Sequence, residues 1–187
     1  MAVRDPERTK SRLLAAATIE FAEFGIAGAR IERIAQSARA NKQMIYAYFG
    51  NKDGLFDAVF TAHVGASLAA VDFDVTDLPG YAGRLFEHFE DDPAALRLST
   101  WYRLERPNGA GLLAVISINQ LRLERLTQAQ AGGALPRDFE PVALLALIQA
   151  IATSWATMNP EFGAVASADR ASRRRAVVEA TQRLLSV

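Results

Sequence analysis

Side chains that can contact nucleic acid are concentrated in one short segment of the chain. Lys42 and Lys52 are cations suited to phosphate groups, and Gln43 can form two hydrogen bonds with the edge of an adenine base. The phenolic groups of Tyr46 and Tyr48 can bond phosphate oxygens or contact a thymine methyl group. Together these residue types indicate a surface that reads the major groove of double-stranded DNA.

Two short helices must position these side chains. Ile34 and Ala35 predict the buried side of a helix over residues 31–38, and Asn41 is a favourable N-cap for a helix over residues 42–49. Because only about four residues separate the two helices, they must cross steeply. The pattern predicts a helix-turn-helix, whose second helix enters the major groove.

The segment IAQSARANKQMIYAYFGNKDGLF resembles the DNA-binding domain of TetR-family transcriptional regulators. The matching features are the Ile-Ala pair, a lysine at the start of the third helix, Tyr-x-Tyr-Phe, and Asn-Lys followed by Leu-Phe. The preceding AAATIEFAEFGIAGARIERIA matches that family's first helix, its glycine and the start of its second helix, so the resemblance covers about residues 8–60. It implies that the DNA-contact positions are occupied by Lys42, Gln43, Tyr46, Tyr48 and Lys52.

Several positions near the turn leave alternatives open. Ala29 stands where the family usually has Thr or Ser, so one helix cap and one hydroxyl for phosphate are missing. Arg39 stands where Gly is common, so it must adopt an unusual backbone angle or the turn must differ. Arg30 and Arg33, near the start of the second helix, could contact phosphate or bases, or could be ordinary surface charges. Tyr46 could equally belong to the core.

The composition limits the classes of protein to which the chain could belong. The chain has 187 residues, of which 50% are hydrophobic, and its net charge is zero. Residues 1–52 nevertheless hold nine basic and five acidic side chains, which favours a DNA-binding head, although a difference of this size also arises by chance. The abundance of alanine, and of arginine over lysine, indicates a GC-rich bacterial genome.

Other classes of protein lack their usual signals in this chain. No G-x-S-x-G, P-loop, G-x-G-x-x-G or H-E-x-x-H motif occurs, so we expect neither an enzyme nor a cofactor. Two isolated histidines and no cysteine predict no metal site and no disulfide. No apolar run reaches about 18 residues and no secretory signal is visible, so we expect a cytoplasmic protein that does not enter a membrane.

Helical periodicity runs through the chain, and no segment alternates convincingly with the period of two residues that is typical of strands. We predict an all-α fold of about nine helices, with a three-helix DNA-binding head and a larger helical body. The head would be residues 1–52, and the ligand-binding and dimerisation domain would be residues 53–187. The helices are predicted over residues 6–24, 31–38, 42–49, 52–71, 80–91, 93–105, 110–130, 139–158 and 167–186.

The last two predicted helices are expected to form a homodimer interface. A symmetric operator needs two heads one turn of DNA apart, ~34–36 Å, and a single head makes few contacts. The helix over residues 139–158 is apolar around most of its circumference, which requires burial on more than one side. The alternative is burial within one monomer. The expected interface residues are Val142, Leu145, Gln149, Ala152, Ala156, Val177, Ala180 and Leu184.

The resemblance further implies a pocket for an unidentified small-molecule effector in the body. Such pockets are mostly apolar with a few polar groups, although aromatic residues at helical spacing are more often simply core residues. The candidate lining residues are His63, Phe86, Phe89, Trp101, Tyr102, Ile116, Asn119, Gln120, Trp155 and Met158.

These observations combine into one expected function. We expect a ligand-responsive transcriptional regulator, most simply a repressor, that binds a palindromic operator as a homodimer and is released by a small apolar effector. Effector binding would tilt the helix that starts at Lys52 and change the separation of the two heads. The alternative is a helical protein-interaction module that retains a head-like fold without binding DNA.

Overall fold

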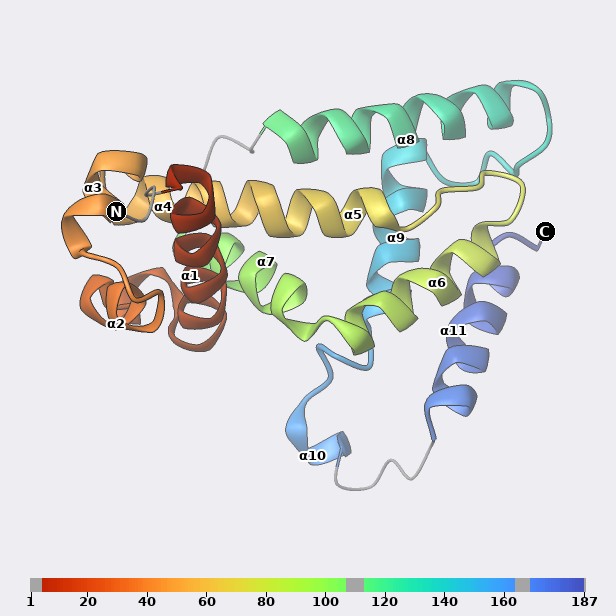
Figure 1. Cartoon of the computed structure of the whole chain (residues 1–187). Coiled ribbons are helices and arrows are strands. Elements are labelled where there is room, and N and C mark those ends of the chain that lie inside the picture. The colour runs from red at the N-terminus through yellow and green to blue at the C-terminus, as the bar shows by residue number, and fades with distance from the viewer. Residues whose placement is uncertain (1–4, 107–112, 164–168, 187) are drawn as a thin grey trace. The chain divides into compact units, whose positions relative to one another are not determined.

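The computed structural model describes residues 5–106, 113–163 and 169–186, and every regular element within these ranges is helical (Figure 1). The predicted all-α fold is therefore confirmed. The chain forms two compact units, of which the first combines Met1–Leu68 with Ala94–Val115 and the second combines Ala69–Pro93 with Ile116–Val187. The domain boundary predicted after residue 52 falls inside the first unit.

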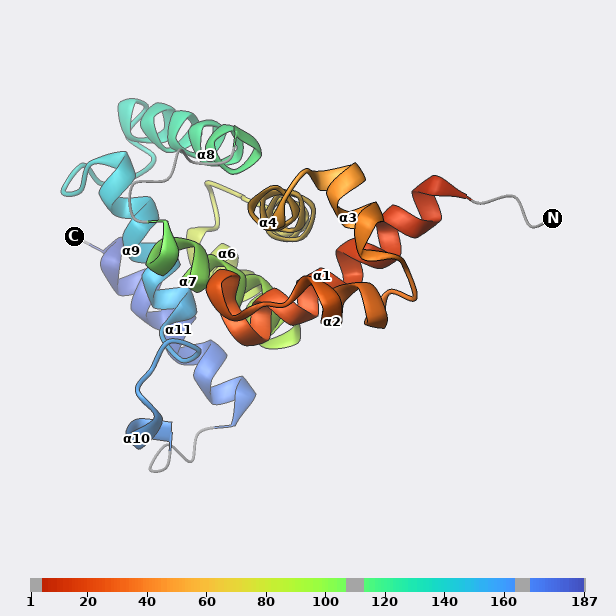
Figure 2. The same cartoon turned by 90° about the vertical axis from the view of Figure 1, so that its left-hand side faces the viewer.

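The first unit combines the N-terminal helices with one helix from later in the chain. Its helices are α1 (Pro6–Gly28), α2 (Ile31–Ser37), α3 (Lys42–Phe49), α4 (Lys52–Phe60) and α7 (Pro93–Glu105). α4 continues through a π-helical turn (Thr61–Gly65) into α5 (Ala66–Ala70), in agreement with the single helix predicted over residues 52–71. α1 packs against both α2 and α4, and Figure 2 shows α4 end-on beside them.

Capping side chains and a shared apolar core explain the helices of the head. The carboxylate of Asp5 accepts hydrogen bonds from the amides of Glu7 (3.1 Å) and Arg8 (3.2 Å), and Pro6 occupies the first helical position of α1. Gly25 has a φ of 70° and interrupts α1 at the helix end predicted from the sequence, after which the chain makes one more helical turn. The fully buried residues of this core include Leu13, Phe21, Ile34, Ile45, Leu55, Phe56 and Val59.

The second unit is built around α6. Its helices are α6 (Leu78–Asp91), most of α8 (Leu113–Ala131), α9 (Pro141–Thr153), α10 (Pro160–Gly163) and α11 (Arg170–Leu184). α6 packs against both α9 and α11, as Figure 1 shows. The core of this unit includes Tyr81, Leu85, Phe86, Leu126, Leu144, Ile148 and Val177.

Ion pairs align α11 with α6. Three arginines on α11 lie against three carboxylates near the C-terminal end of α6. The pairs are Arg170–Asp91 at 2.8 Å, Arg173–Glu90 at 2.6 Å and Arg174–Glu87 at 2.9 Å. The arginine-rich start of α11 is therefore used within its own unit.

The helix predicted over residues 139–158 extends too far. The observed helix α9 ends at Thr153, and the residues from 154 to 158 form turns. The hydroxyl of Thr153 donates to the carbonyl of Gln149 (2.9 Å), and that of Ser154 donates to the carbonyl of Ile151 (2.8 Å). Ser99 and Thr100 make bonds of the same kind inside α7, so these bonds alone do not end a helix.

The remaining predicted helices overlap with observed ones. The segments predicted over residues 110–130 and 167–186 begin at residues that lie outside the described ranges, and within those ranges they correspond to α8 and α11. The short α10 was not predicted. No helix in the described part of the chain is both long and apolar enough to cross a membrane.

Candidate nucleic-acid interface

The turn between α2 and α3 is held by two backbone hydrogen bonds. The amide of Ala40 donates to the carbonyl of Ala35 (2.9 Å), and the amide of Arg39 donates to that of Gln36 (3.0 Å). This pair of bonds is the Schellman motif, whose central residue must be left-handed. Arg39 indeed has a φ of 49°, so of the two alternatives left open by the sequence, an unusual backbone angle or a different turn, the structure has the unusual angle.

α3 presents its polar side chains outward because one apolar residue anchors its inner side. Ile45 is fully buried in the core of the head, and Asn41 caps the helix by accepting a hydrogen bond from the amide of Gln43 (3.0 Å). Lys42 and Gln43 are exposed, and 49% of Tyr46 is exposed, so Tyr46 is not a core residue.

Tyr48 is half-buried and packs at the edge of the core, with its ring 6.1 Å from that of Phe49. Its partly exposed position on α3 leaves it available for the predicted phosphate contact. The structure therefore brings the four predicted contact residues of α3 together on one short helix.

A carboxylate from α1 holds the start of α2. No side chain caps α2, whose N-cap residue is Arg30. The buried Glu20 instead accepts hydrogen bonds from the amide of Arg30 (2.8 Å) and from Nε of Arg33 (2.8 Å). Burial alone would raise the pKa of Glu20, but these hydrogen bonds and the charge of Arg33 outweigh it and lower the pKa.

Several predicted contact residues already have intramolecular partners. Arg33 pairs with Glu20 at 2.5 Å and lies over the ring of Phe24, whereas Arg30 is exposed. The ammonium group of Lys52 donates to the carbonyls of Ala27 (3.1 Å) and Ala29 (3.3 Å).

Lys42 lies 3.6 Å from the carboxylate of Glu32, and both side chains are largely exposed. An exposed pair of this kind is worth only about 0–1 kcal/mol, so Lys42 can exchange Glu32 for a phosphate group at little cost.

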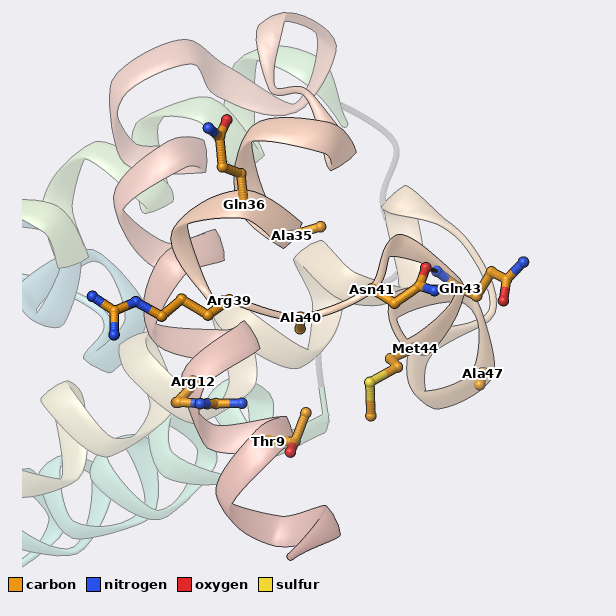
Figure 3. Close-up of a pocket in the computed structure, with 10 residues that line it drawn as sticks. All are labelled: Thr9, Arg12, Ala35, Gln36, Arg39, Ala40, Asn41, Gln43, Met44 and Ala47. Atoms are coloured by element: carbon orange, nitrogen blue, oxygen red, sulfur yellow. Dashed lines mark hydrogen bonds between the residues drawn. The ribbon is translucent and has the colours of Figure 1, made fainter. Parts of the chain in front are cut away.

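A cleft separates α3 from the N-terminal half of α1. Its volume is about 780 Å³, and Figure 3 shows Arg12 and Arg39 on one side of it with Gln43 and Ala47 on the other. The residues that line it are Thr9, Arg12, Ala35, Gln36, Arg39, Ala40, Asn41, Gln43, Met44 and Ala47. None of these lining residues is acidic, so this α1–α3 cleft is a polar and basic hollow next to the predicted recognition helix.

One side of α7 binds the main chain of α1, a role that the sequence did not indicate. Arg97, Trp101 and Glu105 recur at intervals of one helical turn. Nε of Arg97 (2.6 Å) and Nε1 of Trp101 (3.3 Å) donate to the carbonyl of Ala22. The carboxylate of Glu105 accepts from the amides of residues 26 and 27, both at 2.8 Å.

The ten candidate pocket residues are divided between the two units. His63, Trp101 and Tyr102 belong to the first unit, where Tyr102 stacks on Phe56 and its ring lies 4.7 Å from that of Phe60. In the second unit, Phe86 is buried in the core and Phe89 and Trp155 pack against that core. The others are half-buried (Asn119, Met158) or exposed (Ile116, Gln120).

A group of polar side chains lies inside the second unit. The guanidinium of Arg122 is buried over the rings of Phe73 and Tyr81, and burial lowers its pKa. Asn119 lies one turn earlier on the same side of α8, with its Oδ1 atom buried. In the described part of the chain, no group of three or more His, Asp or Glu could hold a metal ion.

Some of the candidate dimer residues lie at the surface of the second unit, and others lie in its core. Val142 is 63% exposed, and Ala156 and Ala180 are exposed as well. Gln149 and Leu184 are half-buried. The remaining three lie in the core of the second unit and are Leu145, Ala152 and Val177.

Comparison with known proteins places both parts of the chain in one family. Residues 77–183 match the model described as Tetracyclin repressor-like, C-terminal domain, and residues 13–59 match Bacterial regulatory proteins, tetR family. The HTH-type transcriptional repressor SCO4008 of Streptomyces coelicolor is 50% identical over 105 residues, covering 56% of this chain and 55% of that protein. The HTH-type transcriptional repressor NicS of Pseudomonas putida is 44% identical over 61 residues, covering 33% of this chain and 28% of that protein. The matches thus span about half or less of these relatives.

Solved structures agree over nearly the whole chain. The crystal structure of SCO4942 from Streptomyces coelicolor superimposes with a TM-score of 0.82 at 43% identity, covering 94% of this chain and 97% of that one. The fatty acid degradation regulator FadR from Bacillus halodurans, with a TM-score of 0.65 and 18% identity, shares the fold. The family consists of regulators rather than enzymes, which confirms the prediction that this chain is not an enzyme. The helix-turn-helix, the helical second unit and these relatives together establish that the chain belongs to the TetR family of bacterial transcriptional regulators.

Proposed function

We propose that the chain is a cytoplasmic homodimeric repressor that binds a palindromic operator through α3 and is released by a small apolar effector. The observation that carries the proposal is the surface of α3, where a buried Ile45 and the Asn41 cap leave Lys42, Gln43 and Tyr46 facing outward. Side chains of these types read base edges and hold phosphate groups. Two relatives named as repressors support repression as the mode of regulation.

Dimerisation follows from the small size of the DNA-binding surface. α3 has only eight residues, so one copy can contact few base pairs. Two copies related by a twofold axis would read two half-sites ~34–36 Å apart, which converts two weak contacts into one specific complex. The exposed apolar Val142 and Ala180 of the second unit are the residues that we assign to the interface.

Release by an effector requires that a conformational change be transmitted to the DNA-binding head, and contacts of α7 can transmit it. Glu105 binds the end of α1, and the next residue, Arg106, binds the carboxylates of Asp53 (3.0 Å) and Asp57 in α4. A movement of α7 would therefore act on α4, which packs against α3, and on α1, which packs against α2 and α4. Effector binding that favours a shifted α7 and α4 would change the separation of the heads and weaken operator binding.

Selection from a random library of duplex DNA tests the proposal. We expect the full chain to enrich a palindrome at physiological salt. A Lys42→Ala, Gln43→Ala variant should enrich none, because it loses two exposed contact side chains while its fold stays intact. Failure of the full chain to enrich any sequence, at moderate or low salt, would instead favour a protein-interaction module that does not bind DNA.

A further inference from the structure

The α1–α3 cleft carries two arginines that the predicted DNA contacts do not include. Arg12 comes from α1 and Arg39 from the turn, and both are exposed. They belong to a lining without any acidic residue, so no carboxylate of the cleft neutralises them. A basic hollow beside a recognition helix attracts the phosphate groups of DNA.

The strained backbone of Arg39 indicates that its side chain has a functional role. Its φ of 49° lies in the left-handed region, which glycine or asparagine adopts with less strain. The turn itself needs only the amides of residues 39 and 40, and glycine would make the same two hydrogen bonds. The strained arginine therefore adds a guanidinium to the cleft without improving the turn.

The two sides of the cleft differ in chemistry. Arg12 and Arg39 lie on one side and Gln43 and Ala47 of α3 on the other, with Met44 between them (Figure 3). A DNA strand that follows the edge of the major groove presents phosphate oxygens along its outside and base edges toward the groove. In this orientation its phosphates would meet the arginines while α3 reads the bases.

We propose that Arg39 and Arg12 bind the sugar-phosphate strand that borders the groove entered by α3. The proposal rests on the proposed function, since it requires α3 to enter DNA. Phosphate contacts fix the position of a protein on DNA but carry no sequence information. Loss of either arginine therefore weakens binding to all duplexes alike and leaves the preferred sequence unchanged.

The test measures how the affinity of the full chain depends on salt. The probe is a duplex enriched by the selection described above, with a scrambled duplex of the same length beside it. The variants are Arg39→Gly, which removes the charge and relieves the backbone, and Arg12→Gln. The matched control is Arg103→Gln, because Arg103 is an exposed arginine of the same unit, on α7 outside the cleft.

Arg39→Gly should melt at a temperature no lower than the unaltered chain, yet bind DNA more weakly. The slope of log affinity against log salt concentration should become shallower by about 0.9 for each phosphate group that the variant no longer neutralises. Arg12→Gln should behave in the same way, and Arg103→Gln should keep the original slope.

An unchanged slope in Arg39→Gly and Arg12→Gln, while the unaltered chain binds the enriched duplex, would overturn this inference and leave the proposed function standing. A change of preferred sequence in Arg39→Gly would also overturn it, because Arg39 would then read bases. If the unaltered chain binds neither duplex, the proposed function itself fails.

Discussion

At the level of single residues, the buried Glu20 binds the backbone at the start of α2. Its carboxylate accepts the amide of Arg30 and the side chain of Arg33, and both bonds hold the first turn of α2 against α1. The same contacts occupy Arg33, which reduces its availability for DNA. Glu20 thus holds the start of α2 and pairs with Arg33, whereas the side chain of Arg30 is exposed.

Replacing Glu20 with glutamine should destabilise the fold by about 1–3 kcal/mol at neutral pH, because a buried charge-assisted hydrogen bond is weakened. The lowered pKa of Glu20 means that its carboxylate stabilises the fold above the unfolded value of 4.5. That stabilisation is lost as the pH falls through the folded pKa. Urea unfolding should therefore show that the free energies of unfolding of Glu20→Gln and of the unaltered chain converge as the pH falls from neutral to below 4.5.

Glu23→Gln provides the control, since Glu23 is exposed on the same helix. A constant difference between Glu20→Gln and the unaltered chain at all pH values would show that the charge of Glu20 does not contribute.

The sequence predicts features that depend on a residue's own backbone. It does not predict hydrogen bonds between a side chain and a part of the chain that is distant in sequence. The unusual angle of Arg39 could be predicted from its place in the turn, because the turn motif fixes that angle. The role of Glu20 could not, because it depends on how α1 crosses α2. The same holds for Lys52, whose bonds to the carbonyls of Ala27 and Ala29 require the folded head.

At the level of elements, α7 is bound to the C-terminal end of α1 through side chains that recur once per turn. Arg97 and Trp101 donate to carbonyl groups of α1, and Glu105 accepts two of its amides. Gly25 makes this approach possible, since a Cβ atom there would lie 2.6 Å from Glu105 and 2.8 Å from Trp101. The kink in α1 and its contact with α7 therefore depend on one residue.

Gly25→Ala and Gly50→Ala form a matched pair of variants. Both glycines have positive φ angles, of 70° and 78°, so alanine strains the backbone at either site by about 1–3 kcal/mol. A Cβ atom at Gly50 meets nothing within 4 Å, whereas one at Gly25 collides with α7. Gly25→Ala should consequently lower the melting temperature more than Gly50→Ala. Equal effects of the two substitutions would contradict the close packing of α7 on α1.

Helical periodicity predicted the order and most of the extents of the helices, because each amphipathic stripe is local. Helical periodicity does not show which neighbouring helix the apolar side of a helix packs against. The hydrogen bond from the indole of Trp101 to the carbonyl of Ala22, for example, could not be predicted from the helical pattern. The end of α9 at Thr153 was missed because apolar residues continue beyond it, at Trp155, Ala156 and Met158.

At the level of the whole molecule, the proposed function requires two copies of the chain. Some expected interface residues are used within the monomer, since Leu145 and Val177 are buried in the core of the second unit. Val142 and Ala180 remain at the surface of that unit. A helix that is apolar on several sides can thus serve the monomer core and still offer an outer face to a partner.

A Val142→Glu, Ala180→Glu variant should be monomeric in sedimentation equilibrium and should keep its helical circular dichroism, because both residues are exposed in the monomer. Its affinity for a palindrome should fall by at least about 100-fold, as the two heads then bind independently. A variant that remains dimeric would place the interface on another surface.

The central claim is that α3 reads DNA, and it is tested most directly by equilibrium binding at one physiological salt concentration. The full chain and the Lys42→Ala, Gln43→Ala variant would each be titrated against the enriched duplex and its scrambled form. The control is an Arg103→Ala, Gln128→Ala variant, because these two residues are exposed and lie on α7 and α8, outside α3. We predict that the full chain and the control prefer the enriched duplex by about 1,000-fold or more, and that the α3 variant loses most of this preference. An α3 variant that keeps the full preference would contradict the claim.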